Sequence, residues 1–125
     1  MNGTAPHYPR PAQIEAYGAG GFRFAGMSHR GSILALPSGI WAWPPRTPAE
    51  IDSASLVRVV DEKAVIDVLL VGCGREPVLL AEPVRQSLRE AGLSFDTMPT
   101  RAAASTYNVL FAEGRRVAAA LLAVE

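Results

Sequence analysis

The glycine loop Gly72-Cys73-Gly74 carries the single thiol of the chain, the side chain with the clearest capacity for covalent chemistry. A glycine loop directly after a buried strand is a recurrent place for a bound phosphate or a reactive cysteine. A nucleophilic cysteine usually needs a basic partner, however, and neither histidine is near Cys73 in sequence. Pro77 stands where a third fingerprint glycine would be, and no Walker lysine follows. We therefore expect a tight turn, with a ligand-approach loop and a nucleophilic Cys73 as the alternatives.

A second group of polar side chains lies in the stretch from Thr97 to Val117, TMPTRAAASTYNVLFAEGRRV. Its pattern predicts a helix that is capped by the Thr100 side chain and ends near Ala112, with Gly114 as its stop. The apolar stripe, which we expect to be buried, consists of Ala103, Tyr107, Leu110 and Phe111.

Six side chains of this stretch are candidates for contact with a ligand or a partner. The helix N-terminus, if it lies beside the glycine loop, would offer amides to a ligand at the carboxyl end of the preceding strand. The arginines after the helix, with Arg101 at its start, would present cations to an acidic partner. The structural alternative is that the hydroxyl and amide groups bond within the fold and the arginines are solvated. The candidates are Thr100, Thr106, Tyr107, Asn108, Arg115 and Arg116.

An N-terminal β-hairpin is predicted by two alternating runs on either side of a glycine-rich turn. Gln13 to Tyr17 alternates apolar and polar residues, and Phe22-Arg23-Phe24 resumes the alternation after Gly18-Ala19-Gly20-Gly21. Gly18-Ala19-Gly20 also begins like a dinucleotide-binding fingerprint. That motif needs a helix to open after the glycines, whereas the residues here alternate like a strand and Arg23 replaces the last glycine. We therefore expect a turn.

The next stretch predicts two short strands. Gly31 to Leu36 and Ile40 to Trp43 are apolar runs of strand length, separated by the turn residues Pro37-Ser38-Gly39. Trp41 and Trp43 share one face of the second strand. We expect them to close an edge of the core, with an exposed interaction surface as the alternative.

A helix is predicted after the prolines that follow these strands. Leu56, Val59 and Val60 recur at helical spacing, which indicates a helix from about Ser53 to Glu62. Thr47 to Glu50 has the form of a capping box with proline at the first helical position, and so offers an earlier start.

The second half of the chain alternates strands with helices, which is typical of α/β proteins. Val65 to Val71 is rich in β-branched residues and predicts a central strand buried on both faces. Around it we expect a helix over Pro83 to Ala91, a strand over Leu93 to Met98 and a closing strand over Val117 to Val124, although propensity alone would make this last segment helical. The predicted fold is α/β with α+β character: a two-layer domain with a mixed sheet, an N-terminal hairpin and about three helices.

Composition limits the classes of function that fit the chain. Its 125 residues are 49% hydrophobic and 19% charged, as in one globular domain. Lys plus Arg and Asp plus Glu both number 12, a balance that argues against a nucleic-acid partner and eases self-association into a homo-oligomer. A single cysteine and the lack of a targeting pattern predict a cytoplasmic protein, and no apolar run is long enough for a membrane span. Three early prolines predict a flexible leader over residues 1–12, before a single domain over residues 13–125.

Two strings of the second half resemble a small-domain family of unknown function that includes a mitochondrial respiratory complex I assembly factor. They are LLVGCG over residues 69–74 and MPTRAAASTYNVLFAEGRRVAAAL over residues 98–121. AYGAGGFRFAG and GSILALPSGIWAW are similar to that family's opening, so the resemblance covers nearly the whole chain after the leader. It implies a two-layer α/β domain, no established enzymatic activity and, for the mitochondrial relatives, help in assembling a membrane-bound respiratory complex.

Two positions depart from the family pattern. The family's loop usually reads glycine-threonine-glycine, and Cys73 takes the place of the threonine here. Many members carry cysteine and arginine before the Thr-Tyr pair, where this chain has Ala104 and Ser105. A redox or anion-binding role of that cysteine or arginine is therefore not available to this chain.

Two functions follow as alternatives. The first is a non-enzymatic bacterial interaction protein, whose protein partners would belong to respiratory or membrane-protein assembly machinery. It rests on the resemblance, the balanced charge and the lack of a nucleophile–base pair or metal-ligand cluster in the sequence. The second is a small-molecule-binding domain or minimal enzyme with a crevice between Gly72–Gly74 and the Thr100–Asn108 helix. No cofactor or metal is predicted for either.

Overall fold

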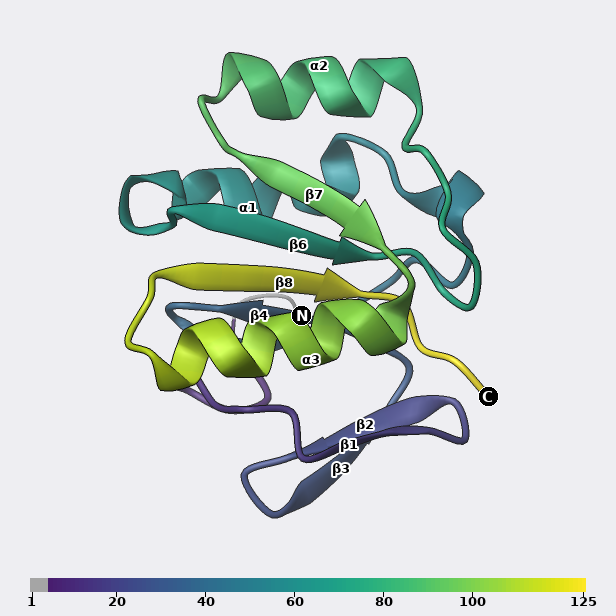
Figure 1. Ribbon diagram of the computed structural model, residues 1–125, viewed down its shortest axis with the longest axis vertical. Coiled ribbons are helices and arrows are strands. Elements are labelled where there is room, and N and C mark those ends of the chain that lie inside the picture. Colours follow the sequence, from purple (N-terminus) through teal and green to yellow (C-terminus); the bar gives the residue numbers. More distant parts are fainter. Residues whose placement is uncertain (1–4) are drawn as a thin grey trace.

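A five-stranded mixed sheet and a smaller three-stranded sheet form the frame of the computed structural model, which describes residues 5–125 (Figure 1). The larger sheet has the order β5-β4-β8-β6-β7, with β6 parallel to both β8 and β7 and with β4 antiparallel to β5 and β8. The smaller sheet is an antiparallel meander of β1, β2 and β3. The strands are β1 Ala16–Gly18, β2 Gly21–Phe24, β3 Met27–Arg30, β4 Ser32–Leu36, β5 Gly39–Trp43, β6 Val68–Gly72, β7 Phe95–Met98 and β8 Val117–Leu121.

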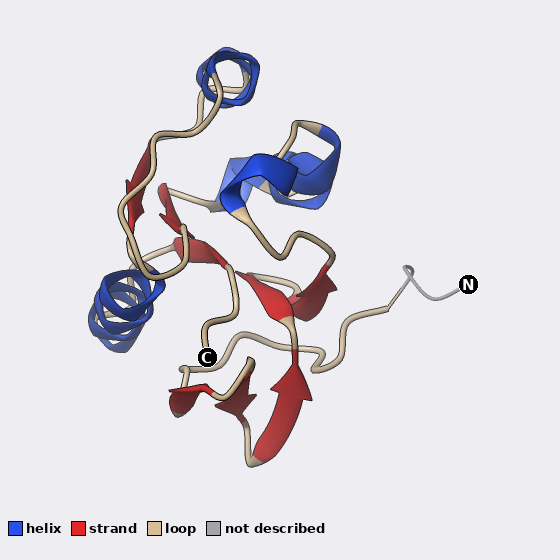
Figure 2. Ribbon diagram, turned by 90° about the vertical axis from the view of Figure 1, so that its right-hand side faces the viewer, coloured by secondary structure: helices blue, strands red, loops and turns tan. Residues whose placement is uncertain are grey.

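Helices cover both faces of the larger sheet. Figure 2 shows α3 on one side of it and α1 on the other, which adds a layer to the two that we expected. The α-helices are α1 Val57–Asp61, α2 Glu82–Glu90 and α3 Thr100–Ala112, and short 3-10 turns lie at Pro48–Glu50, Ala54–Leu56 and Lys63–Val65. None of the helices in residues 5–125 has the length and apolar character needed to cross a bilayer.

Two hydrophobic clusters follow from the alternation of side chains across the larger sheet. Leu69 and Val71 of β6 point toward α1 and α2, where Val59 and Leu88 are fully buried. Leu70 between them points toward α3, together with Phe24 of the small sheet. Because β6 lies between β8 and β7 and is covered on both sides, it needs the apolar run that predicted a central strand.

The small sheet is built from two tight hairpins. Ala19 and Gly20 connect β1 to β2, and Ala25 and Gly26 connect β2 to β3; all four have positive φ. Positive φ at both loop residues gives the turn that matches the right-handed twist of the strands. The first hairpin was predicted, and the dinucleotide-binding alternative is wrong. Strand β3 was not predicted, because alanine is an uncommon residue in the left-handed region and gives a weak turn signal.

Most predicted elements are confirmed, including the α/β class, the mixed sheet, the closing strand β8 and the glycine stop of α3 at Gly114, where φ is 77°. The helix expected over 53–62 is divided between a 3-10 turn and α1. Trp41 and Trp43 are only 8% and 3% exposed, so the hypothesis of an exposed tryptophan pair is wrong. Their indole N–H groups donate to Ser38 Oγ and to the Ser55 carbonyl, which satisfies both within the core edge.

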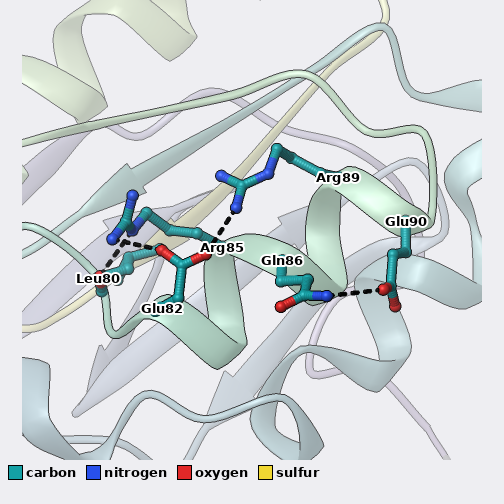
Figure 3. A network of polar contacts seen from close by, with 6 residues as sticks. All are labelled: Leu80, Glu82, Arg85, Gln86, Arg89 and Glu90. Carbon is teal, nitrogen blue, oxygen red and sulfur yellow. Dashed lines mark hydrogen bonds and ion pairs between the residues drawn. The ribbon is translucent and has the colours of Figure 1, made fainter.

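The exposed side of α2 carries its own network of charges (Figure 3). The Glu82 carboxylate pairs with Arg85 at 2.7 Å and with Arg89 at 2.9 Å, while Arg85 Nε donates to the Leu80 carbonyl at 3.0 Å. Glu82 lies in the first turn of the helix, where a negative charge is favourable. Arg85 and Arg89 are therefore both paired with a carboxylate of their own helix.

Alanines in β8 allow α3 to approach the sheet, which gives a test of the packing. Ala119 has no exposed surface, and the larger side chain of Ala119→Leu should destabilise the fold by about 1–3 kcal/mol. Urea unfolding followed by tryptophan fluorescence measures the change. Ala112→Leu, at an exposed position of α3, is the matched control and should stay within about 0.5 kcal/mol. Equal midpoints for the two variants would contradict this account of the packing.

Candidate functional site

The predicted crevice at the carboxyl end of β6 brings Gly72, Gly74 and Thr100 together. The Thr100 hydroxyl donates to the Leu122 carbonyl at 2.8 Å and accepts the Gly74 N–H at 3.0 Å. The Thr100 N–H in turn donates to the Gly74 carbonyl at 2.8 Å. Thr100 has no exposed surface, so all of these bonds lie inside the protein.

Thr100 does not cap α3, so that prediction is wrong. Pro99 occupies the capping position with extended backbone, at φ −57° and ψ 149°, and Thr100 is the first helical residue. Proline has no side-chain acceptor for the helix amides, and the threonine hydroxyl faces the β8 terminus instead. Its hydroxyl joins α3, the glycine loop and the chain after β8.

Gly72 shows how closely the chain fills this crevice. A Cβ atom at Gly72 would lie 2.9 Å from Thr100 Cα and 3.0 Å from a Leu121 methyl carbon. The Gly72 carbonyl also accepts the Leu122 N–H at 3.0 Å. At Gly72, the space that the small-molecule hypothesis assigned to a ligand is therefore occupied by α3 and β8.

Cys73 lies in the same loop but faces the core. Its side chain is 2% exposed, and its thiol donates to the Val78 carbonyl at an Sγ–O distance of 3.5 Å. Burial raises the pKa of the Cys73 thiol, and backbone hydrogen bonds oppose this only in part. His7 and His29 contact each other in a tilted arrangement, with ring centroids 4.6 Å apart, and His29 lies beside Phe24 of the small sheet. Burial and a raised pKa both disfavour the thiolate, which favours the structural interpretation of Cys73.

Tyr107 and Asn108 hold the N-terminal segment against α3. The Asn108 side chain accepts the Ile14 N–H and donates to the Ile14 carbonyl, both at 2.8 Å, and the Tyr107 hydroxyl donates to the Ala12 carbonyl at 3.0 Å. Burial raises the pKa of Tyr107 far above its usual range, which keeps this donor protonated. The side-chain amide of Asn108 thus provides hydrogen-bond partners for the N–H and carbonyl of Ile14, a residue that lies outside the strands.

Part of the segment that was predicted to be a leader contacts the larger sheet. The N–H groups of His7 and Tyr8 donate to the Ile40 carbonyl, and Tyr8 forms a β-bridge with Ile40 at the edge of the larger sheet. His7, Tyr8, Ala12 and Ile14, which lie in or next to the predicted leader, are therefore hydrogen-bonded to the domain. The part of the predicted leader at residues 1–4 lies outside the described residues.

The other candidates are separated from the crevice. Thr106 is half-buried on α3, while Arg115 and Arg116 are exposed and precede β8, at the end of the sheet opposite Gly72. Arg116 forms an ion pair with Asp67 at 2.8 Å, and this hydrogen-bonded contact lowers the pKa of the Asp67 carboxyl. The glycine loop and Thr100 thus lie together, whereas Thr106, Arg115 and Arg116 lie elsewhere on the domain. Within residues 5–125, no cluster of three or more His, Cys, Asp or Glu side chains is arranged to bind a metal.

Sequence reasoning missed a hollow of about 600 Å³ on the small sheet. Strand register places Ala16, Arg23 and Ser28 in one cross-strand row and Gly18, Gly21 and Arg30 in the next row on the same face. We call this surface the outer-face hollow. The alternation in Met27 to Arg30 is the sequence signal that indicates it, because it predicts a third strand with polar residues on one face.

The Asn108 contacts predict a specific effect on the N-terminal segment. Asn108→Ala leaves the N–H and carbonyl groups of Ile14 without their partners and should destabilise the protein by about 1–3 kcal/mol. Hydrogen exchange at the Ile14 amide should become faster. Thr106→Ala, on the same helix, is the control and should leave that exchange unchanged. Unaltered protection of Ile14 in the Asn108 variant would show that other contacts hold the segment.

The buried thiol predicts slow labelling and a defined pH dependence. Native Cys73 should react with Ellman's reagent only as fast as the protein opens. Because the folded-state pKa is raised, the unfolded state loses this proton first, so stability should fall as pH rises above the ordinary thiol value of 9.0. Cys73→Ala should remove that part of the pH dependence. Rapid labelling of the native protein would contradict the structural role.

Similar proteins share the sequence and the fold over most of the chain. An uncharacterised protein of Rhodobacter capsulatus is 35% identical over 117 residues, which cover 94% of this chain and 89% of that protein. The mouse protein NADH dehydrogenase (ubiquinone) 1 alpha subcomplex assembly factor 3 is 29% identical over 117 residues, or 92% of this chain. This match spans only 62% of the mouse protein's length.

A crystal structure described as an outer membrane protein from Bartonella henselae has the same fold, with a TM-score of 0.91 and 51% identity. The similarity covers 95% of this chain and 100% of that one. The family model described as "Protein of unknown function (DUF498/DUF598)" matches residues 14–122, a range that includes all the strands of both sheets. The chain therefore belongs to the DUF498 family.

Proposed function

We propose that this chain is a non-enzymatic bacterial interaction protein that helps to assemble the membrane-bound NADH dehydrogenase of the respiratory chain. The observation that carries the proposal is the similarity to an NADH dehydrogenase assembly factor over 92% of this chain. Since the match leaves part of the mouse protein uncovered, the proposal concerns the function of the shared domain.

The geometry of the predicted crevice supports an interaction role over a chemical one. Thr100, Tyr107 and Asn108 use their polar groups in hydrogen bonds within the protein, and the Cys73 thiol is buried. The side chains with chemical capacity therefore stabilise the fold, while the arginines of the small sheet are exposed. The close packing of α3 and β8 around Gly72 favours an interaction role over a small-molecule site at that position.

The proposal includes a cytoplasmic location and protein partners from the assembly machinery of the respiratory complex. A single free cysteine suits a reducing compartment. Contacts with unassembled subunits would involve the surface of the domain, and such surfaces bind through exposed arginine and aromatic side chains.

Deletion of the gene in the source bacterium tests the proposal. Membranes of the deletion strain should contain less assembled NADH dehydrogenase on native gels and should show lower NADH:quinone reductase activity. Succinate dehydrogenase should be unchanged and is the control for general respiratory damage. The wild-type gene and the Cys73→Ala variant should both restore assembly, because no thiol chemistry is required. A deletion strain with a full amount of assembled NADH dehydrogenase would refute the proposed function.

A further inference from the structure

We propose that the outer-face hollow of the small sheet is a docking surface for an acidic segment of a protein partner, recognised by Arg23 and Arg30. The hollow lies on the face of β1-β2-β3 that points away from the core. This small sheet is at the bottom of Figure 1. The inference rests on the proposed function only for the kind of partner, which is a protein.

Strand register places the two arginines on the outer face. Phe22 and Phe24 alternate with Arg23 along β2 and are buried against the main domain, so Arg23 must point outward. Arg30 lies opposite Gly21 on the neighbouring strand, two positions from Ser28, and therefore shares the face of Arg23. Both arginines are exposed and line the hollow.

The floor between the arginines is made of residues with little or no side chain. Ala16, Gly18, Ala19 and Gly21 line it, and a Cβ atom at Gly21 would lie 2.2 Å from the His29 carbonyl oxygen. Glycine is therefore required where β2 and β3 approach each other. A partner's extended chain can consequently come close to the strand backbone, which larger side chains would prevent.

The charges of the hollow are free to meet a partner's carboxylates. Arg23 Nη1 donates to Ser28 Oγ at 2.7 Å, which holds the guanidinium over the sheet without neutralising it. Among the described residues, neither Arg23 nor Arg30 forms an ion pair, whereas Arg85, Arg89 and Arg116 do. The carboxylate of Glu15 is directed to the Gly26 N–H at the far hairpin, and Glu125 lies beside Gly20 at the rim.

The shape of the hollow favours a protein segment over a small anion. Small ligands bind in concave sites that bury most of their surface, whereas this hollow opens along one face of a sheet. Arginine is among the side chains that most often dominate binding at protein interfaces, and both arginines of the hollow are exposed.

The test measures binding of a short fluorescein-labelled polyglutamate peptide to the full chain at low ionic strength, with a polyglutamine peptide of equal length as the neutral probe. The wild-type protein should bind polyglutamate only, and amide NMR shifts should change over residues 16–30. The double variant R23E/R30E should weaken binding by about tenfold or more. The control R101E/R115E reverses two exposed charges elsewhere and should change the affinity by less than about twofold.

Several outcomes would overturn the docking surface. They are a wild-type protein that does not bind polyglutamate, an equal loss in both double variants, and NMR shifts confined to α3. Tighter binding of inorganic phosphate or of phosphatidylglycerol vesicles would also overturn it, because the ligand would then be a small anion or a lipid. Thermal unfolding of each variant verifies that the fold is intact.

Complementation separates this inference from the proposed function. If R23E/R30E restores NADH dehydrogenase in the deletion strain as well as the wild-type gene does, the docking surface is wrong and the proposed function stands. If the deletion leaves assembly unchanged while polyglutamate still binds through Arg23 and Arg30, the proposed function is wrong and the acidic-segment surface stands.

Discussion

The buried hydroxyl of Thr100 is the contact on which the arrangement of the other elements depends. It joins the start of α3 to the loop after β6 and to the chain after β8, three segments that are far apart in sequence. Gly72 makes this junction possible because any Cβ atom there would collide with the Thr100 backbone. Once α3 is held in this position, its apolar stripe covers the alanines of β8, and the two faces of the larger sheet can both be buried.

The position of α3 also determines how the N-terminal segment and the small sheet are attached. Tyr107 and Asn108 hold residues 12–14, and the two phenylalanines of β2 pack against the same cluster as Tyr107. The polar side chains that suggested a ligand site thus provide the hydrogen bonds that an irregular segment cannot make for itself. One consequence is that the small sheet lies with its apolar face inward and its arginines outward.

In this member of the DUF498 family the conspicuous polar side chains of α3 therefore have partners within the fold. The polar groups of Cys73, Tyr107 and Asn108 form hydrogen bonds within the fold. The arginines Arg23 and Arg30, in contrast, are exposed on the outer face of the small sheet. The assembly role that we propose needs selective contacts with partner proteins, for which exposed arginines above a floor of glycine and alanine are well suited.

The sequence by itself determined the α/β class, the central strand β6, the helix α3 with its glycine stop and the first hairpin, because these depend on periodicity and on local backbone preferences. Strand β3 was not predicted, because the Ala-Gly turn before it is a weak local signal and the alternation over Met27 to Arg30 is short. Only the tertiary structure decided the roles of the candidate residues. The partners of Thr100, Tyr107 and Asn108 are 22 to 95 positions away in sequence, so neither spacing nor propensity could show that their polar groups were already bonded. The outer-face hollow was likewise decided by strand register, since only the pairing of β2 with β3 places Arg23 and Arg30 on one face.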